Sequence, residues 1–441
     1  MTVRGKVVFV SLLWSCRLWA NDGQLSLTEL YDASRDNDAT YQVAGHDYQA
    51  SREEEDIGRG GLLPQVGINS RFGHGGQFGD KTTASSQSDQ FSSDTLILSV
   101  SQPLFDKGRW ASYEQAKARG KAGEVQFEGA GQGLFDRVVA AYFDVAQVEN
   151  ELRLATQQKA SIEGLAKQSQ RLFDAGEGAV TDIQEAQSRL DLIRAQEIEL
   201  QARRRAALRK LSGRTGMAVT GISSMQELSP SNRLLAPEEN LDYWMIKANQ
   251  IGPTLEARRA SIQLAEANLK LQKAGHYPTV ALTGQLARVG QSDTNEYSQR
   301  QSTYYLGVVV DIPLYQGGAV SASTARARSA LDSAHSGYDA ESQQLTEDIE
   351  SSYLGVTAGF EKSKALSTAV LSSQSALKSA EKGYQAGVRS TVEILDAQQR
   401  LYTARRDLLN SKLMMLQSYV TLHTRTGQMT RAELEKVQRE F

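Results

Sequence analysis

The sequence predicts a mainly helical protein in which long antiparallel coiled-coil helices are joined to a small number of β-strands. Three observations support this fold class. Only seven of the 441 residues are proline, against a usual share of about 5%, and proline interrupts helix interiors because it lacks a backbone N–H. Two segments that follow glycine turns carry heptad seams of apolar residues. The two halves of the chain also repeat each other.

Composition and charge exclude several classes of function. The chain has 49 basic and 52 acidic side chains and a formal net charge of −3, so no basic bias indicates a nucleic-acid partner. A single cysteine excludes an internal disulfide framework, and the five histidines lack the paired spacing of a helical zinc motif. No phosphate-binding glycine loop, nucleophile elbow or clustered His/Asp/Ser set occurs. We therefore expect no enzyme activity, no metal and no cofactor.

The first 20 residues have the layout of a secretory signal peptide. Basic residues precede an apolar run over residues 7–14, and Ala20 supplies a small residue at the expected cleavage point. The run is too short to span a bilayer; the alternative is a buried N-terminal strand. Residues 13–16 also resemble a lipoprotein cleavage box with Cys16 as the acylated residue, although Trp14 is bulky for that box. We expect an exported protein, with lipidation of Cys16 left open.

An internal repeat divides the mature chain into residues 21–230 and 231–441. Residues 173–190 align with 384–401 at a constant offset of 211, and SQPLFDKGR (101–109) aligns with DIPLYQGGA (311–319) at an offset of 210. LLPQVGI at 62–68 aligns with HYPTVAL at 276–282. Colinear matches of this kind indicate a duplication. The identical pairs of the first alignment are Ala175/Ala386, Gly176/Gly387, Ile183/Ile394, Ala186/Ala397, Gln187/Gln398, Arg189/Arg400 and Leu190/Leu401.

Each half contains two short segments in which apolar residues alternate with other residues. The period of two predicts strand pairs at 62–72 and 95–102 and at 278–288 and 304–312. Stretches rich in Gly, Ser, Gln and Asp separate the members of each pair, and we expect them to be long solvated loops.

Helical patterns follow each strand pair. Long helices are expected over 104–175 and 314–386, each roughly 100 Å long at 1.5 Å per residue. After a glycine turn, shorter helices are expected over 181–211 and 391–422, the second followed by a short C-terminal tail. Five glycines between residues 120 and 133, each of low helix propensity, leave open a bend or loosening of the first long helix at that place.

Another helix precedes each strand pair, over roughly 38–59 and 253–274. Together with the helix after the glycine turn, it approaches the length of the long helix. We therefore expect two helices, stacked end to end, to lie beside one long helix in each half.

The four strands of one chain cannot form a closed transmembrane barrel. A sheet in lipid must leave no edge open, and transmembrane barrels have at least eight strands. Several chains would therefore share one transmembrane β-barrel, to which each contributes four strands. The alternative is a soluble sheet whose apolar face packs on a helix. The export signal, the strand length and the common direction of the long helices favour the barrel.

The SQPLFDKG and IPLYQGG transitions, the glycine turns followed by TDIQEAQ and VEILDAQ, and the TG that ends each repeat resemble the TolC family of outer membrane efflux proteins. The resemblance implies a homotrimer with a twelve-stranded barrel and an α-helical tunnel in the periplasm. It implies passive export of proteins or small molecules, by type I secretion or multidrug efflux. The implied partners are outer membrane lipid, a periplasmic adaptor and an inner-membrane ABC or proton-driven (RND) transporter. The alternative is a periplasmic coiled-coil adaptor or scaffold without a barrel.

Two carboxylates follow the second glycine turn. Glu393 and Asp396 are three residues apart and share a helix face. Under three-fold symmetry they would form an acidic ring that attracts cations at the periplasmic entrance, and the resemblance implies this role. The structural alternative is a capping box at Ser390-x-x-Glu393, with a counterpart from Thr181 to Gln184 in the first half. Sequence alone leaves the two interpretations open.

The resemblance implies further roles at the tips of the two helical hairpins. One residue at the end of the second long helix and one in the turn after it match residues that hold the entrance closed against the neighbouring hairpin, where their partner lies. Without the resemblance they would be a core aromatic and a solvated loop charge. The glycine turns would dock the adaptor. The residues concerned are Tyr384 and Arg389, their partner Asp182 with Thr181 beside it, and the turn glycines Gly176 and Gly387.

Overall fold

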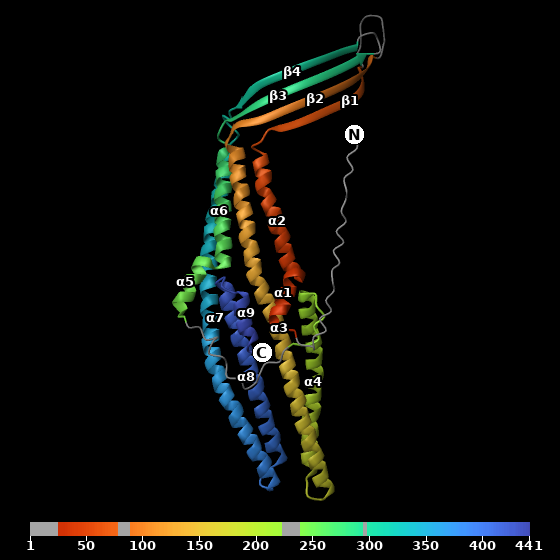
Figure 1. Ribbon diagram of the computed structural model, residues 1–441, viewed down its shortest axis with the longest axis vertical. Helices are drawn as coiled ribbons and strands as arrows, with labels where there is room; N and C mark the ends of the chain where they lie inside the picture. Colours follow the sequence, from red (N-terminus) through yellow and green to blue (C-terminus); the bar gives the residue numbers. More distant parts are fainter. Residues whose placement is uncertain (1–24, 78–88, 223–238, 294–297) are drawn as a thin grey trace, which may run out of the picture.

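The computed structural model describes residues 25–77, 89–222, 239–293 and 298–441 (Figure 1). The expected signal peptide with Cys16, and most of the segment that joins the two repeats, lie outside the described residues. The elements are α1 (Leu27–Asn37), α2 (Ala39–Gly60), β1 (Gln65–Gln77), β2 (Asp89–Asp106), α3 (Lys107–Asp174), α4 (Val180–Thr215), α5 (Leu241–Ile251), α6 (Pro253–Ala274), β3 (Thr279–Asp293), β4 (Ser298–Asp311), α7 (Ala319–Gln385), α8 (Thr391–Arg425) and α9 (Arg431–Gln438).

The order of elements repeats along the chain. Two helices, two strands, one long helix and one shorter helix occur first as α1 to α4 and again as α5 to α8. As expected from sequence, α2 and α4 both pack along α3, and α6 and α8 both pack along α7. Within the described residues, no helix has both the length and the apolar character needed to cross a membrane.

The sequence interpretation did not include α1 and α5, the short helices that precede α2 and α6. Asp38 explains why α1 stops and α2 starts there. Its backbone is extended and its carboxylate accepts a hydrogen bond from the Tyr41 N–H, which caps α2. The same carboxylate, 3% exposed, pairs with Arg137 of α3 at 2.9 Å and with Arg214 of α4 at 3.3 Å. Burial opposes its ionisation, but these bonds and charges outweigh burial and hold the pKa of Asp38 below its ordinary value.

Helix α3 is continuous over 68 residues, so the glycines between residues 120 and 133 do not interrupt it. One of them, Gly123, serves close packing instead. A Cβ on Gly123 would lie 1.9 Å from Oγ and 2.6 Å from Cβ of Ser51 in α2. The tertiary contact between α2 and α3 therefore compensates for the low helix propensity of glycine.

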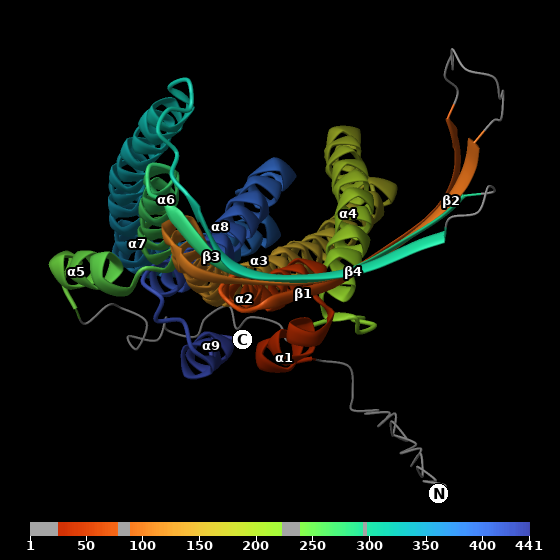
Figure 2. The ribbon, with the colours of Figure 1, turned by 90° about the horizontal axis from the view of Figure 1, so that it is seen from above.

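The four strands form one antiparallel sheet in the order β1-β2-β3-β4. The sheet lies at one end of the helices (Figure 1), and Figure 2 shows its curvature. The central pairing joins β2 to β3, which are separated in sequence by four helices, and its register changes between Pro103 and Phe105. The edge strands β1 and β4 each pair with one neighbour.

The alternation expected from sequence appears as rows of apolar side chains across the sheet. Ile68, Leu98, Leu286 and Tyr304 occupy directly paired positions on the four strands. Their side chains stay exposed, from 37% at Leu98 to 88% at Tyr304. The sheet therefore has an apolar face that the described helices leave uncovered.

Several boundaries differ from the sequence prediction. The strands have 13, 18, 15 and 14 residues, because ladder pairing extends into the polar stretches predicted as loops. The pairing of Gln77 with Asp89 shows this; backbone hydrogen bonds need no apolar side chain. Residues 104–106 belong to β2 rather than to the long helix, and α7 starts at Ala319, after Gly317 and Gly318.

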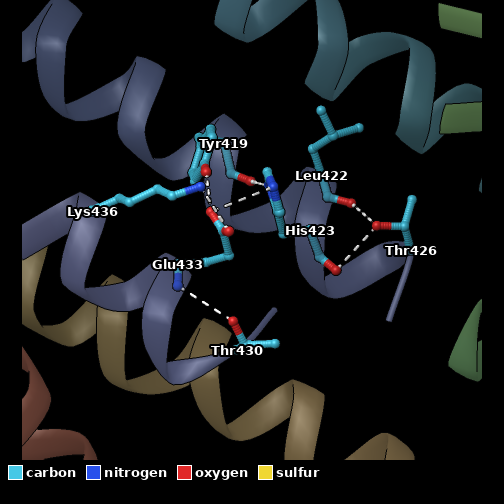
Figure 3. A network of polar contacts seen from close by, with 7 residues as sticks. All are labelled: Tyr419, Leu422, His423, Thr426, Thr430, Glu433 and Lys436. Atoms are coloured by element: carbon cyan, nitrogen blue, oxygen red, sulfur yellow. Dashed lines mark hydrogen bonds and ion pairs between the residues drawn. The ribbon is translucent and has the colours of Figure 1, made fainter. Parts of the chain in front are cut away.

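The C-terminal helix α9 docks on the end of α8 through a polar network (Figure 3). Glu433 of α9 accepts hydrogen bonds from the Tyr419 hydroxyl and from Lys436. Nδ1 of His423 lies 2.9 Å from the carbonyl of Tyr419, and Nε2 lies 3.9 Å from Glu433. Beyond α9, Phe441 packs on aromatic rings of α3. The expected C-terminal tail is thus an ordered helix that joins α8 to α3.

Candidate functional site at the glycine turns

Both long hairpins reverse direction at a glycine, at the end of the molecule away from the sheet (Figure 1). Gly176 follows α3 with φ +78°, and Gly387 follows α7 with φ +74°. In each turn the glycine N–H donates to a carbonyl three residues earlier and the next N–H to one five residues earlier, at 2.8 to 2.9 Å. This is the Schellman motif, which favours glycine because it has no Cβ. The two turns have the same backbone pattern, as the repeat predicts.

The caps of the two returning helices differ. Helix α8 starts with the predicted capping box: the Glu393 N–H donates to Oγ of Ser390 at 3.4 Å, and the Ser390 N–H donates to the Glu393 carboxylate at 3.2 Å. The counterpart box predicted at Thr181 is wrong. Helix α4 starts at Val180. Ala179 occupies its N-cap position, and the alanine side chain cannot accept a hydrogen bond from a backbone N–H. The offset of 211 places Ala179 opposite Ser390, so the first copy lacks the capping hydroxyl and Thr181 lies inside the helix.

Both carboxylates predicted for the acidic ring have basic partners. Glu393 accepts from the Arg389 guanidinium at 3.1 Å within its own hairpin. Asp396 accepts from Arg189 of α4, in the other hairpin, at 3.3 Å. Arg189 also pairs with Glu185, one turn earlier on α4, at 3.1 Å. The site therefore combines a helix cap with an ion pair between hairpins.

The other predicted contacts are only partly brought together. Tyr384 is half-buried, and it lines a groove of about 290 Å³ together with Gly164 and Leu165 of α3 in the other hairpin. Asp182 lies in the first turn of α4. Among the described residues of one chain, no hydrogen bond or ion pair joins Asp182 to Tyr384 or Arg389.

A seam of polar contacts continues from the turns along α3, α4 and α8. The buried Gln398 donates to Ser161 at 2.7 Å. Burial raises the pKa of Tyr402 above its ordinary value, so its hydroxyl stays protonated at neutral pH. The hairpins thus meet through hydrogen bonds as well as apolar packing. The further bonds across this seam are Gln158 to Gln399 at 2.9 Å and Gln196 to Tyr402 at 3.2 Å.

Within the described ranges, no group of three or more His, Cys, Asp or Glu side chains is arranged to hold a metal ion. The charged groups at the hairpin tips include two carboxylates, Glu393 and Asp396, that pair with the guanidinium groups of Arg389 and Arg189. The residue that sequence reasoning missed is Arg189. Its identity with Arg400 in the repeat alignment marked the position, but periodicity carries no information on which residue it contacts.

The family model described as outer membrane efflux protein matches residues 30–217 and 244–428, which is most of the chain. The chain belongs to this family. Among its relatives, the alkaline protease secretion protein AprF of Pseudomonas aeruginosa is 27% identical, over 95% of this chain and 87% of the relative. The outer membrane protein TolC of Vibrio cholerae is 26% identical, over 96% of this chain and 94% of TolC.

Solved structures agree with the family assignment at the level of fold. The crystal structure of CusC matches with a TM-score of 0.79 at 17% identity, over 94% of this chain and 96% of CusC. The family resemblance and fold class expected from sequence are confirmed by these matches. The chain thus has the fold of the family's channel proteins.

Proposed function

We propose that three copies of this chain form an outer membrane channel-tunnel that conducts proteins or small molecules out of a Gram-negative cell. The observation that carries the proposal is the four-stranded sheet, with its two edge strands and its uncovered apolar face. Family membership supports the same function and gives no support to a periplasmic adaptor without a barrel.

The sheet needs further copies of itself to become stable in lipid. Each of its edge strands β1 and β4 pairs on one side, and an unpaired backbone group in hydrocarbon costs several kcal/mol. Side-by-side joining of β1 with β4 of another copy satisfies these groups and closes a barrel. Three copies give twelve strands, above the minimum of eight for transmembrane barrels. The exposed apolar rows would then contact lipid.

The helices would extend the barrel as a tunnel across the periplasm. Helix α3 has 68 residues, which corresponds to roughly 100 Å, and both hairpins point away from the sheet (Figure 1). The hairpin tips at Gly176 and Gly387 would meet a periplasmic adaptor. An inner-membrane ABC or proton-driven transporter would supply the substrate and the energy, so the channel itself conducts passively.

The entrance would lie where the hairpin tips converge. Glu393 and Asp396 of three subunits would form its acidic ring, and Tyr384 and Arg389 would hold it closed against the hairpin that carries Thr181 and Asp182. The half-buried position of Tyr384, in a groove that residues of α3 also line, supports this arrangement. Opening would break charge-assisted hydrogen bonds, which contribute about 1.5–3 kcal/mol each, on docking of the adaptor and transporter.

Fractionation and conductance test the proposal. We expect the protein to stay with the outer membrane after carbonate extraction, to migrate as a trimer that heat dissociates, and to form channels in planar bilayers. A protein that carbonate releases from the membrane, with no trimer band and no conductance, would instead be a periplasmic scaffold. Assays of protein secretion and of drug resistance in a deletion strain distinguish the two classes of exported substrate.

A further inference from the structure

Arg189 contacts two carboxylates on two different hairpins. Its Nε lies 3.1 Å from Glu185 on its own helix α4, and one terminal nitrogen lies 3.3 Å from Asp396 on α8. The planar guanidinium can donate in two directions at once, which a lysine ammonium on a flexible stem does less well. The side chains are 35% to 46% exposed, so the cluster can exchange ions with solvent.

The repeat shows that this pairing is asymmetric. At the offset of 211, Glu185 corresponds to Asp396 and Arg189 corresponds to Arg400. Each acid therefore has an arginine four residues later on its own helix. Among the described residues, Arg400 is exposed and makes no hydrogen bond or ion pair, whereas Asp396 pairs with Arg189 of the other hairpin. Arg189 thus binds both repeat-equivalent acids.

This arrangement changes the charge of the hairpin tips. By formal charge, two carboxylates and one guanidinium give the cluster one excess negative charge. Without Arg189 the excess would double in every subunit, close to the acids of the other subunits. Charge on the wall of a narrow water-filled constriction decides which ions it admits.

We propose that Arg189 is a specificity-determining and positioning residue of the channel entrance. Its positive charge neutralises one of the two negative charges of Glu185 and Asp396. The ion pair with Asp396 also holds the α3/α4 hairpin against the α7/α8 hairpin. The entrance is therefore less cation-selective, and more tightly closed, than its carboxylates alone would make it. This inference rests on the proposed channel function.

Planar-bilayer recordings of Arg189→Gln test it, with Arg400→Gln as the matched control that removes the same charge from the repeat-equivalent position. We expect Arg189→Gln to raise the K⁺-to-Cl⁻ permeability ratio about two-fold or more, to increase block by added Mg²⁺ and to raise conductance. In Arg400→Gln the changes should be clearly smaller. Equal changes in both variants would overturn the proposal.

A double-variant cycle separates the ion pair from a general effect of charge. If Arg189 acts through Asp396, then Arg189→Gln changes conductance less in an Asp396→Asn background. The swapped pair Arg189→Asp with Asp396→Arg should return conductance towards the wild-type value. Independent, additive effects of the two substitutions would contradict a direct role of the pair.

Hydrogen–deuterium exchange of the purified protein tests the contact without conduction. We expect Arg189→Gln, but not Arg400→Gln, to speed amide exchange several-fold over residues 388–396. If the wild-type protein forms no channel, the proposed function fails while a selective rise in exchange still supports the contact. Unchanged exchange in Arg189→Gln would overturn it, whether or not the protein conducts.

Discussion

The side chain of Arg389 lies across Gly383 in the second hairpin, and at the equivalent place in the first hairpin the large and small residues are exchanged. A Cβ on Gly383 would lie 2.9 Å from both Cγ and Cδ of Arg389. At the offset of 211, Leu172 corresponds to Gly383 and Gly178 to Arg389. A Cβ on Gly178 would lie 3.1 Å from the Cβ of Leu172. Each turn therefore accommodates one large side chain.

This exchange predicts the behaviour of Gly383→Leu. The new side chain would displace Arg389 from Glu393, and such overpacking costs about 1–3 kcal/mol, partly offset by about 1 kcal/mol of helix propensity. The double variant Gly383→Leu with Arg389→Gly reproduces the first hairpin and should be better packed than the single variant. Amide exchange at the turn measures the difference. Equal protection in the single and double variants would contradict the packing argument.

The helix caps predict opposite effects of two substitutions. Ser390→Ala removes the capping box of α8 and should destabilise the start of that helix by about 1 kcal/mol. Ala179→Ser should stabilise α4 by a similar amount, because Ala179 already has the extended backbone of a cap, at φ −95° and ψ 144°. Exchange rates of the first-turn amides of α8 and α4 check both. A loss of protection in α4 on Ala179→Ser would count against the cap assignment.

Close packing of α2 on α3 predicts a contrast between two glycines. Gly123→Ala should destabilise the protein by about 1–3 kcal/mol, because the added methyl meets Ser51. Gly131→Ala, with nothing within 4 Å of the added Cβ, should stabilise the same helix by up to about 1 kcal/mol. Thermal unfolding followed by circular dichroism measures both. The double variant Gly123→Ala with Ser51→Gly should recover part of the loss.

The network of His423 predicts a pH dependence of stability. Burial lowers the pKa of His423 below its ordinary value of 6.5, and the charge of Lys436 lowers this pKa further. The hydrogen bond to the Tyr419 carbonyl and the charge of Glu433 raise the pKa, but they do not outweigh burial. The unfolded chain therefore binds a proton more readily than the folded chain, and stability falls as the pH drops below about 6.5. In His423→Asn this part of the pH dependence between pH 7.5 and 5.5 should disappear. Unfolding midpoints of both proteins across that range provide the check, and parallel curves would exclude His423 as the cause.

Local patterns in the sequence were enough to define the repeat, the two long helices, the glycine turns and the capping box at Ser390. These features depend on residues close together in the chain: a period of 3.5 or 2, a glycine that adopts positive φ, or a hydroxyl three residues before an acid. Local patterns gave a wrong prediction where two neighbouring residues could each have been the helix cap. Thr181 resembled a cap, but Ala179 holds the cap position and leaves it without a hydroxyl.

Only the tertiary structure decided which distant segments meet. The pairing of β2 with β3 and the continuity of α3 through its glycines depend on contacts between residues far apart in sequence. Periodicity reveals which face of an element is buried but not the identity of its neighbour. For the same reason, the sequence indicated that Asp396 carries charge at the tip of a hairpin, and only the structure showed that Arg189 of the other hairpin pairs with it.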